Sequence, residues 1–237
     1  MDSIKQGWPR GSHYWGFIQN NWKQIEEHRQ DKVDWWFWDM PYHGRWLPDA
    51  DNWYWRVSKN SVHCASVVER PNDRFNSWNL EIQPWKKNGR EILVCPSSDT
   101  MTRWCTGLGE KEWVQKTVDK IKRHTDRPVR VRYKPRANKM SGPMAEELAG
   151  VPAFTEDIKD VYAVVTAASM CAVDAIAYGI PIFCEADSFA THVGEQDISK
   201  IETPVYAERQ LWFNHLSYQQ YTQEEIASGL AYSIIGQ

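Results

Sequence analysis

The stretch VVTAASMCAVDAIAYGIPIF, residues 164–183, has residue types and spacing that suit phosphate binding. An apolar strand is predicted to end at Thr166, and the small residues 167–169 lead into a helix that stops near Gly179. The first turn of a helix has unpaired N–H groups and a partial positive charge, so it attracts anions. Small side chains leave this turn open, and the Ser169 hydroxyl adds a donor. The same small residues would also let a helix pack closely on a sheet, and spacing alone does not separate the two interpretations.

A basic stretch precedes this turn. Residues 116–139 contain ten Lys and Arg residues against two acidic residues. The helical part of the stretch is expected to present a solvated basic face, whereas Lys134 and Arg136 follow an arginine-bearing strand. Because ligands in open α/β sheets bind beyond the carboxyl ends of the strands, we expect Lys134 and Arg136 to lie at the same edge as Ser169.

A third candidate is the segment CPSSDTMTRW, which follows the apolar strand EILVC. Ser97 and Ser98 occupy this strand-to-helix turn, which is another position where phosphate can meet a helix N-terminus. Pro-Ser-Ser is also an ordinary loop sequence, so the signal is weak.

The segment WDMPYHGRW in the first part of the chain gathers polar side chains in one turn after an aromatic strand. Asp39 or His43 could act as a general base on an acceptor hydroxyl. The alternative is a polar turn in which the histidine is structural.

The segment SMCAVDAIAYGIPIF resembles the donor-binding segment of GT-B-type glycosyltransferases, including the capsule-polysaccharide branch. The family pattern is S-x(3–4)-[ED]-A-x-x-x-G-x-P-[VI]. The resemblance implies that Ser169 and Met170 lie at the diphosphate of a nucleotide-sugar and that Asp174 contacts the ribose, although Glu is more usual at that position. UDP-sugar 2-epimerases share the pattern, so it indicates a fold and a ligand rather than a reaction.

Two further similarities extend this resemblance, which covers about residues 91–235. Lys134-Pro135-Arg136 resembles the basic K-[HP]-[PRH] motif of capsule-type transferases, which implies that these cations bind the donor and neutralise the departing diphosphate. A looser similarity links the D-x-x-Y turn and the following WYWR strand to phage-encoded transferase-like proteins. It implies an acceptor site formed by Tyr42, Arg45, Trp46 and Arg56.

Strands and helices alternate from residue 91 onward, which predicts a parallel sheet of Rossmann type with crossover connections. Strands are expected over 91–95, 127–134, 161–167 and 180–186, with helices over 110–125, 144–150 and 169–179. The first part should hold a helix over 18–30 and strands within 33–46 and 52–64, and a linker over 69–90. The tail is predicted to form two helices, the second capped by Thr222 and Glu225.

These elements predict an α/β protein of GT-B-like fold: a C-terminal Rossmann-like domain with a parallel sheet, plus a reduced, aromatic-rich N-terminal α/β domain. The expected domains are 1–90 on the acceptor side, 91–204 for the nucleotide-sugar, and 205–237 as helices that pack back on both. Nine of the 14 Trp residues lie within the first 55 positions. They could pack in a core or form a surface that stacks on sugars or bases.

Composition narrows the class of protein. A net charge of -3 and a pI near 6.2 do not indicate a generic nucleic-acid binder. Five Cys residues without a CxxC pair, no metal-knuckle spacing and no signal peptide predict reduced thiols in a cytoplasm, that of the host if a phage encodes the chain. No apolar run approaches the roughly 20 residues that span a membrane.

The leading prediction is a metal-independent hexosyl or pentosyl transferase without a cofactor. It would move a sugar from a nucleotide-sugar, such as a UDP-sugar, to a hydroxyl acceptor. Stacking side chains suit either a hydroxymethylated pyrimidine in phage DNA or a glycan as acceptor. The alternatives are a non-catalytic nucleotide- or DNA-binding module and an enzyme of the UDP-sugar epimerase type. The sequence predicts no oligomeric state.

Overall fold

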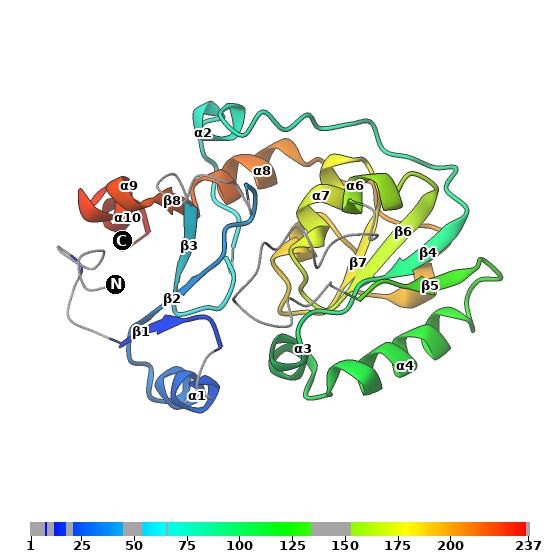
Figure 1. Cartoon of the computed structure of the whole chain (residues 1–237), viewed down its shortest axis with the longest axis horizontal. Helices are drawn as coiled ribbons and strands as arrows, with labels where there is room; N and C mark the ends of the chain where they lie inside the picture. Colours follow the sequence, from blue (N-terminus) through cyan, green and yellow to red (C-terminus); the bar gives the residue numbers. More distant parts are fainter. Residues whose placement is uncertain are drawn as a thin grey trace, which may run out of the picture. The chain divides into compact units, whose positions relative to one another are not determined.

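A computed structural model describes residues 8, 12–17, 21–44, 54–64, 66–133 and 153–235 (Figure 1). The chain divides into two compact units: unit 1 is Met1–Leu80 with Glu208–Gln237, and unit 2 is Glu81–Ala207. Each unit has its own sheet among the described residues. The helix expected over 144–150 lies outside the described residues.

Unit 1 contains a mixed sheet in the order β1-β2-β3-β8. Strands β1 and β2 are parallel and joined through α1, whereas β3 is antiparallel to both β2 and β8. The elements of unit 1 are β1 (Ser12–Trp15), α1 (Trp22–Asp31), β2 (Trp35–Asp39), β3 (Tyr54–Lys59), α2 (Asp73–Asn76), α8 (Gln210–Ser217), β8 (Gln220–Thr222), α9 (Gln223–Ala227) and α10 (Leu230–Ile235).

The two faces of the unit 1 sheet carry different chemistry. Alternate residues of a strand point to opposite faces. Trp36 and Trp38 of β2 pack with Trp8, Tyr221 and other residues in an aromatic cluster on one face. The opposite face carries Trp35, Phe37 and Asp39 of the same strand and is covered in part by α1, whose His28 bonds Ser12 of β1. The described tryptophans of β2 therefore serve packing.

The C-terminal tail contributes a strand as well as helices. The sequence predicts two helices there, but Gln220–Thr222 pairs with β3 as an edge strand. The predicted capping box is confirmed: Thr222 Oγ1 accepts the Glu225 N–H, and the Glu225 carboxylate accepts the Thr222 N–H. Residues 69–90, expected as a linker, contain the short helix α2. Its Phe75 is buried against Phe213 of α8, which holds this segment in unit 1.

Unit 2 contains a parallel sheet in the order β5-β4-β6-β7, which confirms the prediction of alternating strands and helices. That the two units together form a GT-B architecture stays a prediction. The elements of unit 2 are β4 (Glu91–Val94), α3 (Asp99–Thr106), α4 (Glu110–Ile121), β5 (Val129–Val131), α6 (Phe154–Asp157), β6 (Val161–Thr166), α7 (Cys171–Ala177), β7 (Ile182–Cys184), and the 3-10 turns η2 (Phe189–His192) and η3 (Ile198–Lys200).

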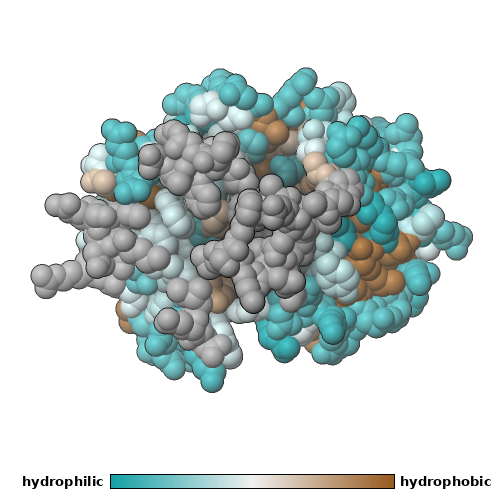
Figure 2. Space-filling model, in the orientation of Figure 1, coloured by the Kyte–Doolittle hydropathy of each residue, from teal (hydrophilic) through white to brown (hydrophobic). Residues whose placement is uncertain are grey.

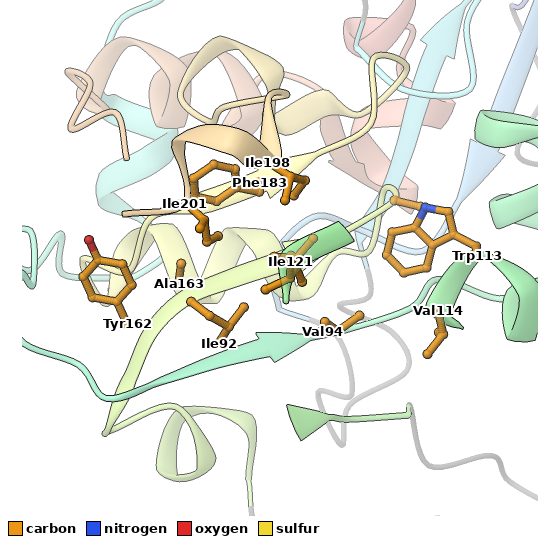
Figure 3. Close-up of a cluster of buried hydrophobic side chains, with 12 residues drawn as sticks. Ile92, Val94, Trp113, Val114, Ile121, Tyr162, Ala163, Phe183, Ile198 and Ile201 are labelled. Atoms are coloured by element: carbon orange, nitrogen blue, oxygen red, sulfur yellow. The ribbon is translucent and has the colours of Figure 1, made fainter. Parts of the chain in front are cut away.

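The core on one side of this sheet joins the strands to α4. Trp113, Val114 and Ile121 lie on one face of α4 because residues three, four, seven and eight apart share a helix face. They pack with apolar side chains of β4, β6 and β7 (Figure 3). Strands β6 and β7 are fully buried and β4 nearly so, as expected for a parallel sheet covered by helices, whereas the edge strand β5 is half-buried.

Gly179 ends α7 as predicted. Its φ is +75°, and a Cβ at this position would lie 2.0 Å from the carbonyl oxygen of Pro84. The backbone of residues 83–86 reaches this close to α7 through bonds from the Gln83 N–H to Ala177 and from the Lys86 N–H to Gly179. A side chain at Gly179 would therefore clash with the chain segment that enters unit 2.

The described surface on the face in Figure 2 is mostly hydrophilic, with smaller apolar areas between. Among the described residues, no helix has the length and apolar character needed to cross a membrane.

Candidate functional site

The two central strands of the unit 2 sheet, β4 and β6, have a topological switch point between them at their carboxyl ends. From β4 the chain continues to β5 on one side, while β6 lies on the other side. The connections from these two neighbouring strands therefore leave in opposite directions. In open α/β sheets such a point leaves a crevice beyond the strand ends, where ligands bind.

The turns that follow β4 and β6 are joined by a hydrogen bond. Ser97 Oγ accepts the N–H of Ala168 at 3.0 Å, and both residues are buried. The Ser97 carbonyl also accepts the Thr102 hydroxyl at 3.4 Å. The structure thus brings together two turns, at 97–98 and 167–170, that the sequence analysis treats as separate phosphate-facing positions.

In the second turn, backbone N–H groups donate to side-chain hydroxyls. The Ser169 N–H donates to Thr166 Oγ1 at 3.0 Å, and the Cys171 N–H donates to Ser169 Oγ at 3.4 Å. A hydroxyl that accepts an N–H keeps its own proton for donation. The half-buried Ser169 thus has a hydroxyl proton to donate, whereas Ser97 and Thr166 are buried, and these N–H groups are not the bare helix donors expected from the sequence.

The other donor-site predictions fall at the same edge. Ser98 is the N-cap of α3, where its Oγ accepts the Met101 N–H at 3.3 Å. Met170 is buried and directly precedes α7. Asp174 is half-buried in the first turn of α7, where a negative charge is stabilised by the helix dipole. Their roles toward a ligand stay predictions.

Lys134 and Arg136 lie outside the described residues, but the strand before them is described. Arg130 forms ion pairs with Glu91 at 2.7 Å and Asp157 at 3.0 Å, and Arg132 pairs with Asp157 at 2.6 Å. Burial disfavours the charge of Asp157, but the two arginines outweigh it and lower its pKa. Much of the positive charge of the strand is therefore balanced within the protein.

Two features of this edge escaped the sequence analysis. Glu185 follows β7, where its N–H donates to the Ala167 carbonyl at 3.2 Å and its Oε1 accepts the Trp113 indole N–H at 2.7 Å. The thiols of Cys95 and Cys171 are hydrogen-bonded, and this contact with burial raises the pKa of Cys95. The rule that ligands meet strand ends could have found Glu185, whereas the cysteine spacing gave no sign of the thiol contact.

In unit 1, Asp39 ends β2 and is held by two donors. Its Oδ2 accepts Arg56 Nη2 at 2.7 Å, and its Oδ1 accepts the Met40 N–H at 2.7 Å. The Asp39 side chain is 33% exposed and the Arg56 side chain only 2%. The predicted base is thus a partly accessible carboxylate backed by a buried cation.

Arg56 directs its other N–H groups into the protein. Its Nη1 lies 2.7 Å from both the Val62 carbonyl and His63 Nδ1. The guanidinium carbon also lies 5.5 Å from the ring centroids of Phe37 and Tyr42. An arginine can only donate, so Nδ1 of His63 accepts and that imidazole is neutral.

Tyr42 is buried beside this arginine. Its hydroxyl accepts the Cys64 N–H at 3.1 Å, and burial raises the pKa of both the phenol and the Cys64 thiol, the latter to about 11. Direct contact between an acceptor and the buried Tyr42 or Arg56 would require local opening. The predicted contacts Arg45 and Trp46 lie outside the described residues.

His43 is held by both its backbone and its ring. The Gln220 side chain accepts the His43 N–H at 3.0 Å and donates to the His43 carbonyl at 3.1 Å. The imidazole stacks on Trp78, with Nε2 3.3 Å from the Trp78 carbonyl. Burial lowers its pKa, so the ring is neutral at pH 7, and Nε2 donates to the carbonyl. That tautomer leaves Nδ1 as an acceptor, the form a general base requires.

No group of three or more His, Cys, Asp or Glu residues in the described part of the chain is arranged to hold a metal ion.

Comparison with known proteins gives structural neighbours only. No family model matches the sequence, and no curated protein matches it significantly. The beta Kdo 2,7 transferase of Thermosulfurimonas dismutans KpsC is similar with a TM-score of 0.51 at 12% identity, covering 93% of this chain and 84% of that chain. The beta Kdo 2,4 transferase of the same protein has a TM-score of 0.49 at 12% identity, covering 86% and 78%. The first similarity places the chain in the mixed α/β fold of that transferase.

Proposed function

We propose that this protein is a glycosyltransferase that moves a sugar from a nucleotide-sugar to a hydroxyl acceptor. The observation that carries the proposal is the hydrogen bond between Ser97 and Ala168. It joins the two turns at the switch point of the unit 2 sheet, where proteins with such sheets bind nucleotides. The fold similarity and the sequence motif at 169–182 support the same conclusion.

In this proposal unit 2 binds the donor. The hydroxyls of Ser97 and Ser169 donate to the diphosphate, with Ser98 and Met170 beside it, and Asp174 accepts a ribose hydroxyl. Lys134 and Arg136, proposed from sequence alone, supply positive charge to the departing diphosphate without a metal ion. Hydrogen-bond donors placed where charge develops lower the barrier because they are already oriented.

Unit 1 would activate the acceptor. The acceptor oxygen forms a bond to the sugar carbon while the bond from that carbon to the diphosphate oxygen breaks, and its electron pair stays on the diphosphate. The acceptor proton passes to Asp39 or His43. Asp39 forms an ion pair with Arg56, and burial lowers the pKa of His43, which suits both groups to accept a proton.

We propose a hydroxymethylated pyrimidine in phage DNA or a glycan as the acceptor, and a UDP-sugar as the donor. The structural neighbours are Kdo transferases, so a Kdo donor belongs beside UDP-glucose in any test.

A non-catalytic nucleotide-binding module is the second candidate. The burial of Tyr42 and Arg56 favours it, because two of the predicted acceptor contacts are engaged inside unit 1.

Two measurements separate these functions. A thermal-shift panel of nucleotides and nucleotide-sugars should raise the melting temperature for at least one nucleotide. Incubation of that donor with hydroxymethyl-containing DNA or with glycans should then give a glycosylated product. If no nucleotide stabilises the protein, the donor site is wrong, and if a donor binds but no product or donor hydrolysis appears, the binding module is correct.

The Lys134→Ala variant tests the leaving-group role. We expect turnover to fall by about 100-fold, because one charged stabiliser of a transition state is worth that much. Lys116→Ala is the matched control, since Lys116 is exposed on α4 and pairs only with Glu112 among the described residues. Equal activity of the two variants would contradict the role.

A further inference from the structure

Three polar side chains form one row across the unit 1 sheet. Asp39 of β2 lies opposite Arg56 of β3, and Arg56 lies opposite Gln220 of β8. Residues directly opposite in antiparallel strands project to the same face. This face is the one that carries Phe37, while Trp36 and Trp38 point into the aromatic cluster on the other side. The row therefore forms a polar line on one face of an otherwise aromatic sheet.

Arg56 at the centre of the row is buried, and both of its Nη groups bond within the protein, while Nε has no hydrogen-bond partner among the described residues. Its Nη1 meets the Val62 carbonyl and His63, and its Nη2 meets Asp39. A buried cation is stable only with a counter-charge and with hydrogen bonds to its N–H groups. Asp39 supplies the charge and is itself partly exposed. Its exposed side is thus where the row can meet another molecule.

Gln220 at the end of the row fixes the backbone of His43. Its amide bonds both the N–H and the carbonyl of His43, which fixes the backbone that carries the imidazole. The centre and one end of the row therefore each hold a candidate base: Arg56 holds Asp39, and Gln220 holds His43.

We propose that Arg56 and Gln220 are positioning residues, which hold the Asp39 carboxylate and the His43 imidazole for proton transfer and do not contact the acceptor. This inference rests on the proposed function, because it concerns the same reaction. It reassigns Arg56 from acceptor binding to support of Asp39. It also gives a catalytic purpose to the strand pairing of the C-terminal tail.

Among the described residues, few titratable groups lie against Arg56, which simplifies the interpretation of a pH profile. The other titratable groups packed against Arg56 are Tyr42, His63 and Cys64. Burial raises the pKa of Tyr42 and Cys64, so both are neutral between pH 5 and 9. His63 Nδ1 accepts an N–H of Arg56. Asp39 and Arg56 form the ion pair of the row.

The first experiment measures transfer or hydrolysis of UDP-glucose, with hydroxymethyl-containing DNA as acceptor, for Arg56→Lys, Arg56→Met and Gln220→Ala. We expect kcat to fall about 100-fold in Arg56→Met, less in Arg56→Lys, with the KM for acceptor within about twofold. Loss of the cation should raise the pKa of the acid limb by about 1 to 3 units. Lys59→Met is the control, because Lys59 is a cation on the same strand that pairs with exposed Asp34.

A higher acceptor KM with unchanged kcat in Arg56→Lys would overturn the inference, since it would mean that Arg56 contacts the acceptor. An acid limb that does not move in Arg56→Met would overturn it too.

The second experiment needs no activity. Carbon NMR follows the Asp39 carboxyl, assigned by its absence in Asp39→Asn, during a pH titration of the wild type and of Arg56→Lys and Arg56→Met. We expect Asp39 to titrate at higher pH without Arg56, and the His43 amide signal to shift in Gln220→Ala. An unchanged Asp39 titration would refute the support by Arg56 even if the protein transfers no sugar. Absence of transfer with the expected titration would refute the proposed function alone.

Discussion

The candidate sites of the two units are formed by different kinds of groups. In unit 2 the site consists of turns at the ends of parallel strands, in which side-chain hydroxyls accept the backbone N–H groups, as in the bond between Ser97 and Ala168. In unit 1 it consists of charged and amide side chains in one row across antiparallel strands, centred on Arg56. This difference predicts which substitutions each site can tolerate.

A site built from turns depends on where the chain runs, so added bulk near a turn should damage it more than the loss of one side chain does. A site made of side chains depends on the identity of a few residues, because each charge in a buried pair stabilises the other. The four predictions below test this contrast, from the largest expected effect to the smallest.

Gly179→Ala should cause the largest loss. The new Cβ would lie 2.0 Å from the Pro84 carbonyl oxygen at a φ of +75°, so we expect the free energy of unfolding to fall by about 3 kcal/mol or more. Gly107→Ala is the control: its φ is +74° with nothing within 4 Å of the Cβ, and it should cost about 1 kcal/mol. Chemical denaturation measures both, and equal losses would show that backbone approach at Gly179 is unimportant.

Glu225→Gln tests the dependence of unit 1 on a single charge. Burial disfavours the Glu225 carboxylate, but Arg74, which bonds both of its oxygens, lowers its pKa. A lowered pKa in the folded state stabilises the protein above the unfolded pKa near 4.3, and this contribution disappears as the pH falls through the lower folded value. At pH 7 we expect a loss of about 2 kcal/mol, which shrinks toward zero as the pH approaches 3.

Melting temperatures at a series of pH values check this prediction. The neighbouring Glu224→Gln is the control, because Glu224 is exposed on the same helix. A difference between Glu225→Gln and the wild type that stays constant from pH 7 to 3 would be inconsistent with the ion pair.

Ser97→Ala removes the bond that joins the two turns of unit 2. The buried Ala168 N–H then lacks its partner, so we expect a loss of about 1 to 2 kcal/mol and weaker stabilisation by nucleotides in a thermal-shift assay. Ser98→Ala removes only the N-cap bond of α3, which costs about 1 kcal/mol and should leave more of the nucleotide effect. If Ser97→Ala binds nucleotides as the wild type does, the bridged turns are not the donor site.

Lys116→Ala should have the smallest effect. Lys116 forms an exposed pair with Glu112 one helical turn away, and such pairs contribute about 0.3 to 0.5 kcal/mol. Its melting temperature and nucleotide response should match the wild type. A marked loss of nucleotide binding would mean that the basic face of α4 takes part in the site.

Much of the fold of unit 2 could be predicted from the hydrophobic pattern of the sequence. The alternation of apolar strands with the amphipathic helix at 110–121 predicts a parallel sheet, and Gly179 marks the end of α7 because few residues accept its backbone conformation. The strand at 220–222 did not follow from pattern. Its sequence, QYT, is too short to show a period of two, and only pairing with β3 makes it a strand.

The candidate sites divide in the same way. Asp39, His43, Ser97 and Ser169 stand out in the sequence because polar residues directly after apolar strands are positioned at sheet edges. Of their partners, Gln220 carries no comparable local signal, because strand pairing brings it in from a distant segment. Arg56 and Ala168 lie in segments that the sequence marks, but their bonds to Asp39 and Ser97 appear only in the fold.

The sequence by itself determined the class of fold in unit 2, the cap of α9, the end of α7 and the residues with reactive groups, because propensity, periodicity and capping act over a few neighbouring residues. Only the tertiary structure decided which of those groups are accessible and which are engaged. Arg56 is an acceptor-binding candidate in the sequence and a buried counter-ion of Asp39 in the fold. Burial and ion pairing depend on residues far apart along the chain, and that information appears only when the sheet is assembled.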